Sequence, residues 1–216
     1  MKTCRVLICD DHAMIREGLR ALLDENPNLE VVGEADNGRE VVRLCTLLNP
    51  DVVIMDIGMP ELNGIEATRL IKAQRPAIRV VALTMHSSRR LVKEMLRAGA
   101  IGYVLKSSAF DELAAALDFA CRDKPYISPS LAGVVLEEFN GRGDGPFPQP
   151  ELTPREREVL QLLAEGHGIK DIAARLYMSE NTAQTHRRNI MEKLNIYSIA
   201  QLTKFAIREG ITSPED

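Results

Sequence analysis

The sequence predicts a doubly wound α/β domain on a five-stranded parallel sheet, followed by a small all-α domain of four helices. Two observations predict the first domain: short runs that are apolar throughout, and helix-periodic segments that separate them. A third observation predicts the second domain, because glycine becomes sparse and the periodicity is helical after residue 151. We place the domains at residues 1–122 and 151–216, with residues 123–150 as the linker.

The five expected strands share a high content of valine and isoleucine: Arg5–Cys9, Glu30–Gly33, Val52–Met55, Val80–Leu83 and Ile101–Leu105. Continuous apolar runs are typical of strands buried on both faces, as in parallel sheets. Asn37, Asn63 and Ser108 each place a capping side chain three residues before an acid, which predicts helix starts between the strands. Strands that alternate with helices predict a doubly wound domain.

The remainder of the chain has turn signals followed by helix signals. Pro129 predicts a short helix as far as Phe139, and residues 140–150 are so rich in glycine and proline that we expect a mobile linker there. Thr153 opens a capping box with proline at the first helical position. Four helices are expected: one from there to about Glu165, then Lys170–Leu176, a helix capped by Ser179 that ends at Leu194, and one capped by Ser198 that ends at Gly210. The tight turn between the second and third predicts a helix-turn-helix.

Composition narrows the class of protein. Lys and Arg number 27 against 31 Asp and Glu, for a formal net charge of -4, which argues against a wholesale electrostatic DNA binder. A small specific DNA-binding module remains compatible with this balance. No apolar run reaches the roughly 18 residues of a membrane span, and the first apolar stretch ends too early for a signal peptide. We therefore expect a cytoplasmic protein that does not bind a membrane.

The four cysteines, Cys4, Cys9, Cys45 and Cys121, lie in apolar settings, and none belongs to a C-x-x-C pair. We expect all four to be buried, reduced thiols. The histidines do not show zinc-ligand spacing.

Polar side chains follow four of the expected strands: Asp10 and Asp11, Asp56, Thr84, and Lys106 with Tyr103 just before it. Because the carboxyl ends of parallel strands share one sheet edge, we expect these groups to converge. Three adjacent carboxylates repel one another, and a hard divalent cation such as Mg²⁺ relieves that repulsion. A carboxylate can also accept a phosphoryl group, whose charge a lysine and a metal ion then neutralise. The set predicts a phosphoacceptor site.

These residues resemble the receiver domain of bacterial two-component systems, which has a flavodoxin-like fold, over residues 4–122. The matching segments are Asp10-Asp11, Asp56-Ile-Gly-Met-Pro60, Leu83-Thr84 and Gly102-Tyr103-Val-Leu-Lys106. The resemblance implies that Asp56 accepts phosphate from a sensor histidine kinase.

The resemblance also implies roles for the other positions. Asp11, Asp56 and the backbone carbonyl of Gly58, assisted by Asp10, would bind Mg²⁺, with Mn²⁺ as the alternative ion. Lys106 would pair with the phosphoryl group. Thr84 would turn toward it as a switch and let Tyr103 move inward, which changes the face formed by the fourth helix, fifth strand and fifth helix.

The third expected helix of the second domain has distinct faces. Ala183, Ile190 and Leu194 fall on one side and are expected to pack inward. The other side carries Asn181, Gln184, Thr185 and Arg188, whose side chains can bond to base edges in the major groove. Arg187 and Lys193 are candidates for phosphate contacts.

The segment from Leu152 to about Thr212 resembles the LuxR-type helix-turn-helix, and the whole chain resembles the NarL/FixJ group of response regulators. The matching residues are Leu152-Thr-Pro-Arg-Glu156, Glu158-Val-Leu160, Ile172-Ala173, Leu176, Ser179, Thr182, Thr185-His186 and Lys193-Leu194. The resemblance implies binding to double-stranded DNA, RNA polymerase as a partner, and a homodimer on activation or on DNA. It implies no enzyme activity beyond slow, Mg-dependent self-phosphorylation and dephosphorylation at Asp56.

The second domain departs from the family pattern at Gly168, Ile169, Ala183 and Gln184. A glycine caps a helix less well than serine, and Gln184 replaces a positive charge although it can still read adenine. These departures favour an alternative: a receiver that acts through protein contacts, with weakened or phosphorylation-independent DNA binding. A magnesium-dependent phosphohydrolase is disfavoured, because position 12 is histidine rather than the aspartate of a dehalogenase-type Asp-x-Asp pattern.

Overall fold

The computed structural model describes residues 3–85, 89–108, 110–133 and 152–212. The chain forms two compact units, Met1–Gly143 and Asp144–Asp216, and each is described by itself. Within the described residues, no helix is both long enough and apolar enough to cross a membrane. The stretch expected to be mobile, residues 140–150, and the expected helix end at Phe139 lie outside the described residues.

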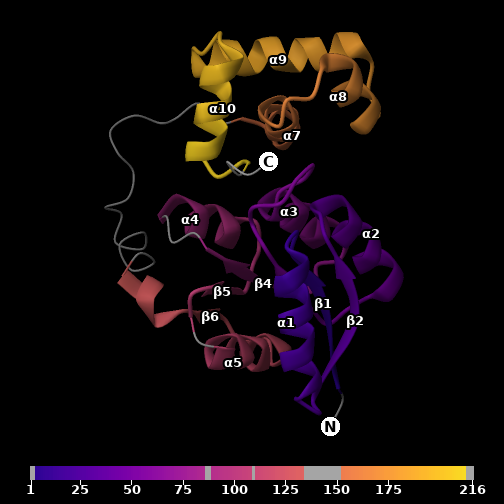
Figure 1. Cartoon of the computed structure of the whole chain (residues 1–216), viewed down its shortest axis with the longest axis vertical. Coiled ribbons are helices and arrows are strands. Elements are labelled where there is room, and N and C mark those ends of the chain that lie inside the picture. The colour runs from indigo at the N-terminus through magenta and orange to yellow at the C-terminus, as the bar shows by residue number, and fades with distance from the viewer. Residues whose placement is uncertain (1–2, 86–88, 109, 134–151, 213–216) are drawn as a thin grey trace. The chain divides into compact units, whose positions relative to one another are not determined.

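The first unit is built on a parallel sheet with strand order β2-β1-β3-β4-β5-β6 (Figure 1). The strands are β1 (Cys4–Cys9), β2 (Leu29–Ala35), β3 (Val52–Met55), β4 (Arg79–Thr84), β5 (Gly102–Leu105) and β6 (Tyr126–Ile127). Each of the five expected runs is a strand, and the doubly wound, flavodoxin-like fold is confirmed.

The sixth strand corrects the expected strand count. Tyr126 donates a backbone hydrogen bond to Ile101 (3.1 Å), and Ser128 donates one to Tyr103 (3.0 Å), so the segment pairs in parallel with β5. Two residues are too few to produce a hydrophobic pattern, so the sequence does not predict this strand. A 3₁₀ helix, Pro129–Leu131, begins at the expected proline, and Leu131 is buried in the sheet core. The expected linker therefore begins as part of the first unit.

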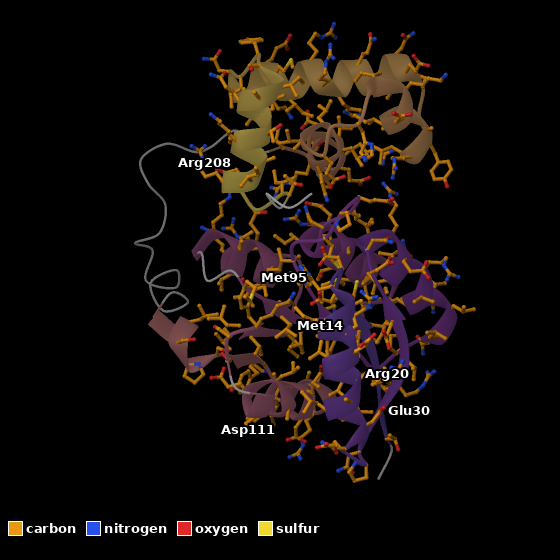
Figure 2. The ribbon with its side chains drawn as sticks, viewed as in Figure 1. Met14, Arg20, Glu30, Met95, Asp111 and Arg208 are labelled. Carbon is orange, nitrogen blue, oxygen red and sulfur yellow. A yellow bond between two sulfur atoms is a disulfide. The ribbon has the colours of Figure 1, made fainter. Side chains whose placement is uncertain are left out.

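Five helices cover the two faces of the sheet: α1 (Ala13–Asp24), α2 (Gly38–Leu48), α3 (Gly64–Gln74), α4 (Arg89–Arg97) and α5 (Phe110–Cys121) (Figure 1). Helices α2, α3 and α4 contribute to one apolar core and α1 and α5 to the other. Met95 of α4 is fully buried, whereas Met14 at the start of α1 is exposed (Figure 2). Asn37 and Asn63 accept hydrogen bonds from the backbone N–H groups of Glu40 and Glu66, so two of the expected caps are confirmed.

A disulfide joins Cys4, the first residue of β1, to Cys121, the last residue of α5. The expectation of reduced thiols is therefore wrong for this pair, and Cys121 is only partly buried. The two cysteines are 117 residues apart, so the sequence pattern does not indicate that β1 and α5 share one core. Cys9 and Cys45 are free and buried, as expected.

The second unit contains α7 (Pro154–Ala164), α8 (Ile169–Arg175), α9 (Glu180–Leu194) and α10 (Ile199–Arg208). Its core includes residues from all four helices, among them Leu160, Ile172 and Ile190. The capping box at Thr153 and the cap by Ser179 are confirmed. Ser198 occupies the position before α10, but its side chain makes no capping hydrogen bond, so that cap is a wrong prediction. The α10 helix is held instead by its buried apolar face, which includes Leu202 and Phe205.

Candidate functional site

The polar residues after four strands converge at one edge of the first unit's sheet. The parallel register sets Ile8 against Ile54 and Cys9 against Met55, so Asp10 and Asp56 leave neighbouring strands side by side. Lys106 donates its backbone N–H to the carbonyl of Thr84 (2.8 Å), which joins the end of β5 to the end of β4. The topology therefore brings the expected carboxylates, hydroxyl and ammonium together.

Lys106 binds two carboxylates at once. Its Nζ lies 2.6 Å from Asp10 Oδ2 and 2.7 Å from Asp56 Oδ2. All three side chains are almost completely buried, so water screens these charges little. Burial opposes the charged form of Lys106, but Asp56 and Asp10 outweigh that effect and raise the pKa of its ammonium.

Opposing effects act on the pKa of the Asp56 carboxyl. Burial raises the pKa of its carboxyl to about 6, and Asp10 adds to the rise, while Lys106 and the backbone N–H of Ile57 act against it. The Ile57 N–H donates to Asp56 Oδ1 (2.7 Å), whereas Oδ2 contacts Lys106. The pKa is raised because burial destabilises the ionised carboxylate by more than its partners stabilise it.

Asp10, Asp11, His12 and Asp56 each offer one ligand atom within 4.8 Å of the others. Three of these groups are carboxylates, the donors that hard divalent cations prefer, so the donor set fits such an ion. His12 was missed by the sequence reasoning, although it directly follows the two aspartates. Its Nδ1 lies 2.7 Å from Asp11, and that carboxylate raises the pKa of His12.

Thr84 and Tyr103 have no exposed surface. Tyr103 therefore occupies an inward position, and burial raises the pKa of its hydroxyl. Gly58 lies two residues after Asp56 and is partly exposed.

Gly64 supports the loop after β3 and was not singled out from the sequence. Its N–H donates to the Ile57 carbonyl (3.0 Å), and an added Cβ would lie only 1.9 Å from the carbonyl oxygen of Asp56. Only glycine allows this approach. Its position after the capping residue Asn63 was the available signal.

The second unit presents a polar face on α9. Ala183 and Ile190 are buried beneath it. A hollow on the other side is lined by Asn181, Gln184, Thr185, Arg187, Arg188, Met191 and Tyr197. Five of these residues were expected to contact DNA, and Met191 and Tyr197 are additions. Tyr197 lies beyond the end of α9 at Leu194. Helical periodicity therefore does not predict which way its side chain points.

Lys193 lies apart from this hollow. Its Nζ is 2.7 Å from Glu156, which also accepts from the backbone N–H of Thr153 (2.8 Å) in the capping box. Burial opposes ionisation of Glu156, but Lys193 and Thr153 prevail and lower the pKa of that carboxyl. Lys193 therefore ties α9 to the start of α7.

Family comparisons assign each unit to a known class. Residues 6–118 match the response regulator receiver domain, and residues 150–206 match the bacterial regulatory proteins of the LuxR family. A receiver joined to a LuxR-type domain defines a DNA-binding response regulator rather than a classical enzyme. The chain belongs to this family, whose members act in two-component systems, so the expected family and function class are confirmed.

Relatives match along almost the whole chain. The transcriptional regulatory protein LiaR of Bacillus subtilis is 38% identical over 209 residues, covering 97% of this chain and 99% of the relative. The response regulator GacA of Pseudomonas aeruginosa is 35% identical, covering 96% and 97%. A solved structure of RcsB from Salmonella enterica serovar Typhimurium, bound to the rprA promoter with the phosphomimetic BeF3⁻, is 29% identical, covers 94% of this chain and 98% of that chain, and has a TM-score of 0.65.

Proposed function

We propose that a sensor histidine kinase phosphorylates Asp56, and that this modification controls sequence-specific binding of double-stranded DNA by α9. The observation that carries the proposal is the position of the Asp56 carboxylate: buried at the end of β3, 2.7 Å from Lys106 and grouped with Asp10 and Asp11. A nucleophile beside a fixed cation and two further carboxylates is the arrangement that aspartyl phosphorylation requires.

In the reaction, an Asp56 oxygen forms a bond to phosphorus while the phosphorus–nitrogen bond of the phosphohistidine breaks. Lys106 then neutralises charge on the transferred phosphoryl oxygens. Asp11, Asp56 and the Gly58 carbonyl, with Asp10, would hold Mg²⁺, or Mn²⁺ in its place. Such an ion, when bound, stabilises the negative charge that Lys106 alone does not balance. Slow hydrolysis of the acyl phosphate at Asp56 is the only turnover we expect.

Thr84 is the switch residue of the proposal. Phosphate supplies strong acceptors next to Thr84 and Lys106 in only one of the two states, and such a differential interaction shifts a conformational equilibrium. Thr84 and Tyr103 lie on the paired strands β4 and β5, with Ala82 opposite Tyr103. We expect Tyr103 to move when Thr84 turns toward the phosphoryl group. The surface that changes in response is the face formed by α4, β5 and α5.

For DNA, Asn181, Gln184, Thr185 and Arg188 are the proposed base-reading residues, and Arg187 is a proposed phosphate contact. Lys193 has the ion pair with Glu156, which gives it a positioning role within the domain in addition to any phosphate contact. Solved structures of RcsB include two dimers bound to two parallel DNAs, which supports a homodimer on DNA for this chain. RNA polymerase as a partner and a cytoplasmic location complete the proposal.

The test compares wild type with Asp56→Ala, in Mg²⁺, before and after treatment with acetyl phosphate. DNA fragments selected by the wild-type protein supply the probe, and light scattering reports the oligomeric state. Wild type is expected to gain DNA affinity or to dimerise, whereas Asp56→Ala does neither. Equal DNA binding by both proteins, unaffected by the donor, would contradict control by phosphorylation.

The alternative is a receiver that acts through protein contacts, with weakened or phosphorylation-independent DNA binding. In the same experiment it predicts either that no DNA is selected, or that wild type and Asp56→Ala bind DNA equally and ignore the donor. Two observations weigh against it. Helix α8 forms at Ile169 although Gly168 supplies no capping side chain, and Gln184 lies exposed among the α9 polar residues.

A further inference from the structure

The disulfide and the carboxylate cluster around Asp56 lie at opposite ends of strand β1. Cys4 begins β1, and Asp10 follows the other end of that strand. Cys121 ends α5, and the Cα atoms of the two cysteines are 6.4 Å apart, within the range that an unforced disulfide requires. The bond closes a loop, residues 4–121, that contains Asp10, Asp11, Asp56 and Lys106.

We propose that Cys4 and Cys121 form a reversible modification site, a thiol pair that is oxidised by low-molecular-weight disulfides such as oxidised glutathione and reduced by the corresponding thiol. The inference rests on the proposed cytoplasmic function, because disulfides in that compartment are typically transient or redox-sensing. Oxidation of the pair fixes the end of α5 to the first strand of the sheet.

Burial separates this pair from the other two cysteines. Cys121 is partly exposed, and Cys4, the first residue of β1, is 9% exposed. Cys9 has no exposed surface and Cys45 has 1%. A small disulfide can therefore approach Cys121, whereas Cys9 and Cys45 are shielded in the native fold.

The exchange balances in two steps. The Cys121 thiolate attacks one sulfur of oxidised glutathione, forming a mixed disulfide and releasing one glutathione thiolate, which takes up a proton. The Cys4 thiolate then attacks the Cys121 sulfur and releases the second glutathione. Two electrons pass from the protein thiols to one glutathione disulfide, and the two thiol protons end on the two glutathione products.

The position of Cys121 determines what the bond restrains. Directly after α5, Lys124 donates its N–H to the Phe119 carbonyl (2.8 Å), and the Phe119 ring meets the Tyr126 ring edge to face at 5.7 Å. Tyr126 belongs to β6, which pairs with the strand that carries Tyr103. The disulfide thus anchors the last turn of α5 and, through it, the segment by which the chain leaves the sheet.

The experiment places the full-length chain in buffers of defined reduced-to-oxidised glutathione ratio, traps free thiols by alkylation, and reads each cysteine by mass spectrometry. Cys4 and Cys121 are expected to become protected from alkylation together as the share of oxidised glutathione rises. They are expected to become reactive again together in excess reduced glutathione. Cys9 and Cys45 are expected to be alkylated only after denaturation. A disulfide that never forms in the native chain, or that persists in excess reduced glutathione, overturns the proposal.

Single variants check the chemistry. Cys4→Ser is expected to accumulate a mixed glutathione disulfide on Cys121, because the resolving thiol is absent. Cys121→Ser is expected to leave Cys4 largely unmodified, since Cys4 is the less exposed of the two. Equal glutathionylation of both single variants contradicts the assigned order of attack.

Hydrogen exchange of wild type in both redox states measures the restraint. Amides of residues 119–128 are expected to exchange about tenfold faster after reduction, as local opening becomes easier. Unchanged exchange refutes the anchoring role. Neither readout uses phosphate or DNA, so failure here leaves the phosphorylation proposal intact, and failure of that proposal leaves the thiol chemistry measurable.

Discussion

Replacing Asp56 with asparagine is expected to stabilise the first unit in the absence of divalent cations, although the substitution removes the proposed phosphoacceptor. The Asp56 carboxyl is 5% exposed, and burial raises its pKa from 3.8 to about 6. A carboxyl whose pKa is raised on folding favours the neutral form, so folding stability falls as the pH rises through about 6. Asparagine has similar size and is neutral at every pH.

The magnitude follows from the pKa. A rise from 3.8 to about 6 corresponds to about 3 kcal/mol of unfolding free energy lost well above pH 6. Asparagine also removes one of the two carboxylates that contact Lys106, and Asp10 remains at 2.6 Å to balance the ammonium. We therefore expect a net gain of about 1–3 kcal/mol at pH 7.5, or a rise in melting temperature of about 3–10 °C.

Differential scanning calorimetry of the full-length chain in EDTA, repeated between pH 4 and pH 8, measures this difference. The gain should be largest near pH 8 and vanish near pH 4, where the wild-type carboxyl is protonated. Mg²⁺ should narrow the difference, since an ion that binds only the folded wild type stabilises it. The matched control is Asp118→Asn, an exposed carboxyl paired with Arg122, which should show no comparable pH-dependent gain. An Asp56→Asn variant that is no more stable than wild type at pH 7.5 would refute the reasoning.

Three further perturbations follow from the contacts. Gly64→Ala forces a Cβ against the Asp56 carbonyl and should cost about 3 kcal/mol or more in urea unfolding, with slower acetyl phosphate labelling; an unchanged unfolding midpoint would contradict the packing. Glu156→Gln weakens the cap and the Lys193 pair and should lower the second unit's stability by about 1–2 kcal/mol by calorimetry, whereas exposed Glu180→Gln should not. Arg187→Ala should reduce the salt dependence of DNA binding by about one phosphate contact, and an unchanged slope places that residue off the DNA backbone.

Much of the fold was predictable because the information is local. An apolar run such as Val52–Met55, with turn residues on either side, identifies a buried strand without knowledge of its neighbours. The convergence of Asp10, Asp56 and Lys106 followed from one topological rule about parallel strands. That rule does not supply the 2.6 and 2.7 Å contacts of Lys106 with both carboxylates, which depend on side-chain conformations.

The features that were missed depend on partners distant in sequence or on single side-chain orientations. Cys4 and Cys121 become neighbours only once β1 and α5 pack on one face. Ser198 is a residue type that favours caps, yet its conformation before α10 does not direct the hydroxyl to a backbone N–H, and packing of Leu202 stabilises the helix instead. Residue preference is a weak prior that tertiary packing overrides.

Strand β6 also shortens the segment that joins the two units. Leu131 is buried in the first core and Leu152 in the second, so each end of the intervening 20 residues is fixed to a folded unit. Covalent geometry allows such a segment a span of at most about 75 Å. A joining segment that began at residue 123 would have an upper limit about 30 Å longer. Because β6 and the 3₁₀ helix take up residues 126–131, the segment between the two cores is shorter than the composition of residues 123–150 alone predicts.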